Sequence, residues 1–70
     1  MISFDLPYGV PVVLTVYNAL GQEVERLADR PYPAGSHQVR WDAPRQPSGV
    51  YLYRLEAGPF SQMRKMLLVR

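Results

Sequence analysis

Few side chains in this sequence could carry out chemistry. It has one histidine, His37, and no cysteine, which excludes a thiol nucleophile, a disulfide framework, a cysteine-type zinc site and any metal site with several histidines. Ser36 precedes His37, but neighbours in a strand point to opposite faces, so the two are not expected to form a catalytic pair. The sequence instead predicts that His37 starts a strand, with its ring beside the core and hydrogen-bonded to the backbone.

The remaining polar residues give no catalytic pattern. Four serines stand in no nucleophile-elbow motif, and Gly49 belongs to a turn, not to a phosphate-binding loop. The six carboxylates are scattered over short segments, without the spacing of an acid–base pair or a calcium loop. We therefore expect a protein that is not an enzyme and that has no cofactor and no metal.

Aromatic residues allow a second interpretation, a flat platform that stacks on sugars or bases. Trp41, Tyr51 and Tyr53 alternate with polar or outward positions and are expected in the core, with hydroxyl groups at its rim. Tyr8 and Tyr32 stand beside prolines in expected loops and are freer. Arg40 and Arg54 are expected on one outer face, but no aromatic RNA-binding signature accompanies them, so no nucleic-acid partner is predicted.

The composition indicates one small folded domain. The chain has 70 residues, of which 47% are hydrophobic and 20% charged, and its net charge is +2. Seven prolines and five glycines separate short runs with the period-two alternation of strands. No window shows a helical period. The sequence predicts an all-β fold, a small immunoglobulin-like antiparallel β-sandwich of six to seven short strands.

The expected elements follow this punctuation. Strands are predicted at 2–6, 12–17, 24–27, 37–42, 50–56 and 60–69, with turns at 18–21, 31–35, 43–49 and 58–59. The two prolines of 31–35 exclude a central strand there, and Gly35 is expected to need a positive φ. The longest apolar runs are a few residues, so no membrane insertion is expected.

The last strand has an unusual pattern. It is apolar on both faces towards its end, which suits a strand covered on both sides or an edge strand that awaits a partner. Arg64, Lys65 and Arg70 flank these apolar residues like gatekeepers. An isolated domain is expected to be able to form a strand-paired dimer through this segment.

Five blocks in order resemble the C-terminal sorting domain of the type IX (Por) secretion system. They are ISFDLP at Ile2–Pro7, LTVYNALGQEV at Leu14–Val24, PAGSH at Pro33–His37, SGVYLYRL at Ser48–Leu55 and RKM at Arg64–Met66. In their order and spacing they extend over nearly the whole chain. The resemblance implies that residues 1–70 are a single seven-stranded sorting domain at the end of a larger secreted protein of the Bacteroidetes or their relatives.

In that family the domain is a secretion signal. The resemblance implies partners in the outer-membrane translocon, a surface sortase and an attached N-terminal cargo protein, with transit through the periplasm to the cell surface or the medium. The recognition residues that it implies are Pro33, Gly35, His37, Gly49, Tyr51, Leu55, Arg64, Lys65, Met66 and Arg70.

Two other functions stay open from the sequence. One is a carbohydrate-binding or spacer module of a multidomain glycosidase, for which exposed and aligned aromatic residues would be needed. The other is the immunoglobulin-like domain of the flagellar hook-capping protein, which the sequence also resembles. Hook-cap domains tend to have a longer connection where this chain passes from Trp41-Asp42 to Ser48 through five residues, which favours the sorting domain.

Overall fold

The computed structural model of the protein describes residues 1–42 and 46–69. These residues form the strands β1 (Ile2–Leu6), β2 (Val10–Asn18), β3 (Glu23–Tyr32), β4 (Gly35–Val39), β5 (Gly49–Ala57) and β6 (Phe60–Leu68). The predicted all-β class and the strand number are confirmed. Within the described residues there is no helix that could cross a membrane.

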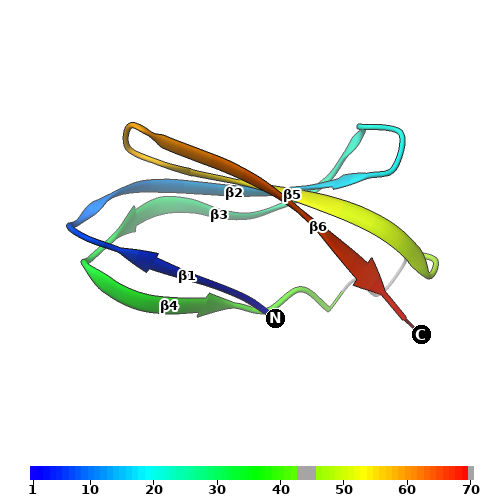
Figure 1. Ribbon diagram of the computed structural model, residues 1–70, viewed down its shortest axis with the longest axis horizontal. Coiled ribbons are helices and arrows are strands. Elements are labelled where there is room, and N and C mark those ends of the chain that lie inside the picture. The colour runs from blue at the N-terminus through cyan, green and yellow to red at the C-terminus, as the bar shows by residue number, and fades with distance from the viewer. Residues whose placement is uncertain (43–45, 70) are drawn as a thin grey trace.

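The six strands form two antiparallel sheets that lie face to face as a small sandwich (Figure 1). One sheet contains only β1 and β4, and the other has the order β3-β2-β5-β6. The chain passes from one sheet to the other after β1, β3 and β4. Strands that are neighbours in space are therefore often far apart in sequence: Phe4 of β1 lies opposite His37 of β4.

Alternating apolar residues build the core, as the period-two pattern predicts. On β1 the buried residues are Ile2, Phe4 and Leu6, while the residues between them are exposed. On β2 the side chains of Val12, Leu14 and Val16 are fully buried. Leu14 lies at the centre, opposite Ala28 of β3 and Leu55 of β5. Removing each such side chain from water contributes about 1.5–3 kcal/mol to folding.

The turn between β2 and β3 forms where the sequence predicts it. The Gly21 amide donates to the Asn18 carbonyl at 3.0 Å, and the Asn18 side-chain oxygen accepts from the Leu20 and Gln22 amides, also at 3.0 Å. Gly21 has φ 84°, a left-handed conformation that glycine adopts without steric cost. The side chain of Asn18 thus replaces missing backbone partners inside the turn.

The strand bounds differ most from the prediction in β3 and β4, while β2 and β5 are longer by one or two residues at their ends. β3 continues through Pro31 to Tyr32, although the sequence predicts a strand only at 24–27 and a turn from residue 31. Because β3 is an edge strand, Pro31 lies where a missing amide donor is tolerated. β4 ends at Val39, before Trp41, which the pattern placed in the same strand. The predicted alternation of exposure nevertheless continues to Asp42.

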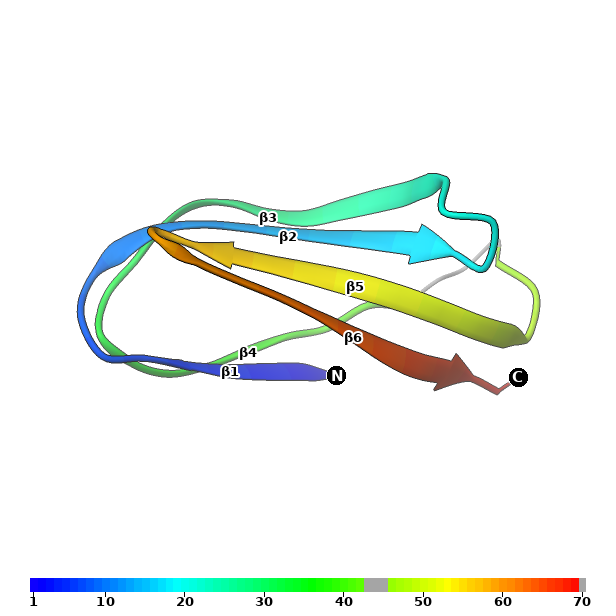
Figure 2. The ribbon, with the colours of Figure 1, turned by 45° about the horizontal axis from the view of Figure 1, so that its top comes forward.

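The two sheets have unequal widths, and this leaves one side of the sandwich open. Two strands face four, so part of the inner face of β6 has no strand opposite it (Figure 2). On that face Phe60, Gln62 and Arg64 are exposed, whereas Met66 and Leu68 are half-buried. The open side is bordered by β1 in one sheet and β6 in the other, and among the described residues each has a strand on one side only.

Candidate protein-interaction site

β6 is an edge strand whose apolar side chains are largely exposed. Phe60, Met63 and Leu67 are 54%, 47% and 69% exposed, and Val69 directly after the strand is 76% exposed. Of the two interpretations of the terminal strand, the structure supports the edge strand that lacks a partner. An edge strand of this kind presents unpaired backbone groups and apolar side chains on which another strand can assemble.

The basic pair lies in the middle of β6 and is not neutralised. Arg64 lies opposite Tyr53 and points to the inner face, whereas Lys65 lies opposite Leu52 and points outward. Both are exposed, and no acidic side chain of the described residues forms an ion pair with either. On the opposite edge strand, β3, Arg26 is balanced by Glu23 at 3.7 Å and Asp29 at 3.3 Å.

The other predicted residues of the last strand divide between core and solvent. Met66 lies opposite Tyr51, is half-buried and packs against the core cluster. It therefore has a structural role besides any contact with a partner. Arg70 lies outside the described residues.

The block Pro33–His37 forms the corner between β3 and β4. His37 Nε2 donates to the Pro33 carbonyl oxygen at 2.7 Å, and the His37 ring packs 5.4 Å from Phe4 and 5.0 Å from Tyr32. Gly35 has φ 120°, as predicted. The predicted environment of His37 is confirmed: its ring stabilises the corner from inside. The Ser36 hydroxyl points the other way and donates to Asp5.

The block Gly49–Leu55 lies on β5 and is mainly structural. Tyr51 is 4% exposed, its ring is edge-to-face with Trp41 at 5.2 Å, and its hydroxyl donates to the Pro47 carbonyl at 2.7 Å. The predicted core position of Tyr51, with its hydroxyl at the rim, is confirmed. Gly49 begins the strand and Leu55 is half-buried on the inner face.

The predicted recognition residues do not form one surface. The corner at Gly35 lies beside Leu6, at the end of the sandwich that also holds the β5–β6 turn (Figure 1). Gly49 and Tyr51 lie at the opposite end, beside Leu68 and Met66. Among the predicted residues that the structure describes, only Arg64 and Lys65 are charged side chains exposed on an edge strand.

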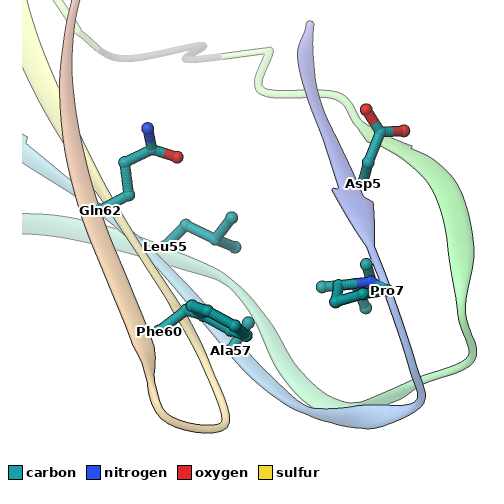
Figure 3. Close-up of a pocket in the computed structure, with 7 residues that line it drawn as sticks. Asp5, Pro7, Leu55, Ala57, Phe60 and Gln62 are labelled. Carbon is teal, nitrogen blue, oxygen red and sulfur yellow. The ribbon is translucent and has the colours of Figure 1, made fainter.

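A groove follows the open side of the sandwich, between β1 and β6. It consists of two adjoining hollows of about 300 Å³ and 390 Å³, which share Asp5, Leu55 and Gln62. The apolar end is lined by Leu6, Pro7, Ala57 and Phe60, and the polar end by Ser3, Phe4, Tyr53 and Arg64. Figure 3 shows Leu55, Phe60 and Gln62 on one wall of the first hollow and Asp5 and Pro7 on the other.

Sequence reasoning missed the groove. The alternation of β1 and β5 indicated which side chains face inward, but not that Leu6 and Leu55 line an open channel. Gln62, near the beginning of the last strand, was the available signal, because a polar residue at an inward position marks a place that the second sheet does not cover.

The remaining sequence hypotheses find less support in the geometry. Tyr32, expected in a loop, is buried in β3 and packs 5.4 Å from Phe4. Arg40 and Arg54 do not share a face: Arg40 follows β4 of the narrow sheet and pairs with Asp42 at 2.7 Å, whereas Arg54 lies on β5 of the wide sheet. Among the described residues no group of three histidine or acidic side chains is placed to hold a metal ion.

Comparison of the chain with protein-family models, with curated proteins and with solved structures gives no match. The site is therefore described by its own geometry: an exposed apolar edge strand with two available cations, beside a groove.

Proposed function

We propose that this chain is a non-catalytic sorting domain, similar to the C-terminal domains of the type IX secretion system, and that it directs an attached N-terminal cargo protein across the outer membrane. Its partners are then the translocon, and a surface sortase that removes the domain after export. The protein passes through the periplasm and ends at the cell surface or in the medium.

The observation that supports this proposal most is that β6 is an exposed edge strand. A domain that serves as an address needs a feature that a receptor can reach while the domain is folded. β6 provides it, because it is an edge strand with exposed apolar side chains and with Arg64 and Lys65 outside any ion pair of the described residues. Addition of a receptor strand to such an edge gives affinity through backbone hydrogen bonds and specificity through alternate side chains.

A carbohydrate-binding module is less favoured. Such a site needs aromatic rings exposed in one plane, but Tyr51 is buried and Trp41 and Tyr53 are half-buried. The exposed rings of Tyr8 and Phe60 lie 6.5 Å apart but are inclined by 50°. No feature of the geometry favours the hook-cap domain over the sorting domain.

The proposal is tested by export of a reporter in a bacterium with a functional type IX system. The reporter carries an N-terminal signal peptide and residues 1–70 at its C-terminus. We expect it at the surface or in the medium only when both the domain and the translocon are intact. Retention of the intact fusion in the periplasm would contradict the proposal.

The charge on β6 is tested with a matched pair of double variants. Arg64→Ser with Lys65→Ser removes two cations from β6, and Arg26→Ser with Arg30→Ser removes two cations from β3, the other edge of the same sheet. The net charge changes equally, so a difference between them reports position. We expect the β6 variant to remain folded and be retained in the periplasm, and the β3 variant to be exported. Equal export of both would exclude the basic pair as the recognised feature.

A further inference from the structure

The groove between β1 and β6 lies where a third strand could be added to the sheet of β1 and β4. β1 has β4 on one side and no strand on the other among the described residues, so its outer backbone groups border the groove. Opposite them, Phe60, Gln62 and Arg64 point inward from β6 without a covering strand. We propose that the groove binds an extended peptide segment of a partner protein, which adds to β1 as a third strand and lies over the inner face of β6.

This inference goes beyond the sorting function and does not depend on it, since it requires only the groove. The lining residues define the orientation of the two walls. Residues 5–7 border the hollow that contains Phe60, and residues 3–5 border the hollow that contains Arg64. β1 and β6 therefore run in opposite directions across the groove. A peptide that is antiparallel to β1 begins at the Phe60 end and finishes at the Arg64 end.

The two ends differ in chemistry, and this selects the peptide. At the first end Leu6, Pro7 and Phe60 form an apolar hollow of about 300 Å³, which suits an apolar side chain. At the second end Arg64 has no ion pair with an acidic residue of the described chain, and it suits a carboxylate. Phe60 and Arg64 are four residues apart on one face of β6, about 13 Å at 3.3 Å per residue. The partner segment therefore carries an apolar residue followed four positions later by Asp or Glu.

A second copy of this chain fits the groove poorly. Of its edge strands, the one with exposed large apolar side chains is β6, which carries Arg64 and Lys65 at its middle. Inserted beside β1, it would bring these cations to the side of the groove that faces Arg64 of the first copy, and like charges brought together repel. The carboxylate of Asp5 does not compensate, since it accepts the Ser36 hydroxyl on the outer face of the narrow sheet. Charge therefore favours an acidic partner segment over β6 of a second copy.

The test uses labelled nine-residue threonine-rich peptides and the 70-residue chain. The first peptide has leucine followed four positions later by glutamate, the second has these two residues exchanged, and the third has lysine in place of glutamate. We expect the first peptide to bind about fivefold more tightly than the lysine peptide, with amide chemical-shift changes along β1. Arg64→Glu should reverse the preference between glutamate and lysine, whereas Arg30→Glu on β3, an equal change of charge, should not.

Folding of each variant is checked by its thermal transition, and Phe60→Ser supplies a second variant at the other, solvent-exposed end of the groove. It should weaken binding of all three peptides without changing the order of glutamate and lysine. Equal binding of the glutamate and lysine peptides, or shifts confined to β3, would overturn the proposal. So would a concentration-dependent dimer of the chain that shows the β1 shifts without peptide, because the occupant would then be a second copy.

Discussion

Tyr51 gives the most direct test of whether a residue of the predicted recognition blocks is structural. Its ring is buried against Trp41, and its hydroxyl donates to the Pro47 carbonyl at 2.7 Å. Tyr51→Phe keeps the ring and removes only that hydrogen bond. We expect a loss of about 1 kcal/mol in the free energy of unfolding, out of roughly 4–10 kcal/mol for a domain of this size. The midpoint of thermal unfolding should fall by about 4–8 °C.

Tyr53→Phe is the matched control, because Tyr53 lies two positions further on the same face of β5 and its hydroxyl has no hydrogen bond within the described part of the chain. Both variants are unfolded with denaturant while circular dichroism records the transition. The dependence of the free energy of unfolding on denaturant concentration should be the same for both variants. The reasoning would be refuted if Tyr51→Phe were as stable as the parent chain, or if Tyr53→Phe lost as much. Loss of partner binding at unchanged stability would instead assign Tyr51 a recognition role.

Three further predictions concern the fold. Gly35→Ala should cost about 1–3 kcal/mol, because φ 120° strains any other residue although the added Cβ meets nothing within 4 Å; Gly9→Ala, where φ is ordinary, should be nearly neutral in the same melting experiment. Leu14→Ala should cost about 2–5 kcal/mol, because it leaves a cavity in the centre of the core, and a loss below 1 kcal/mol in denaturant unfolding would contradict the packing. Met66→Ser should lower the thermal midpoint and Leu67→Ser should not, since only Met66 packs on the core; equal shifts would mean that the faces of β6 are assigned wrongly.

The sequence was sufficient for the local features of the fold. The alternation of Ile2, Phe4 and Leu6 predicts a strand with one buried face, because successive side chains of a strand point to opposite faces and burial of apolar side chains away from water is favourable. The turn at Asn18 and Gly21 and the positive φ of Gly35 follow equally from residue chemistry. The position of His37 was predictable too, since a single histidine between a turn and an apolar strand has few ways to satisfy its ring nitrogens.

The candidate site was predictable only in part. The pattern of the last strand allowed either an edge or a covered strand, and the choice depended on which strands lie beside β5. The predicted loop position of Tyr32 is wrong, because the prolines on either side of it suggest that the strand has ended, whereas an edge strand such as β3 tolerates Pro31. A local segment could indicate at most an uncovered inward position at Gln62, but not the groove, since its walls come from β1 and β6, which are far apart in the chain.

The sequence by itself thus determined which segments contain strands, which of their faces are apolar and where most of the turns lie, because these depend on neighbours within a few residues. Only the tertiary structure decided that β1 pairs with β4, that β2 lies beside β5, and that β1 and β6 are edges facing each other across an open side. The physical reason is that period-two alternation specifies a face but not a partner. The unequal widths of the two sheets, which expose Arg64 and create the groove, arise from pairing between residues far apart in the chain.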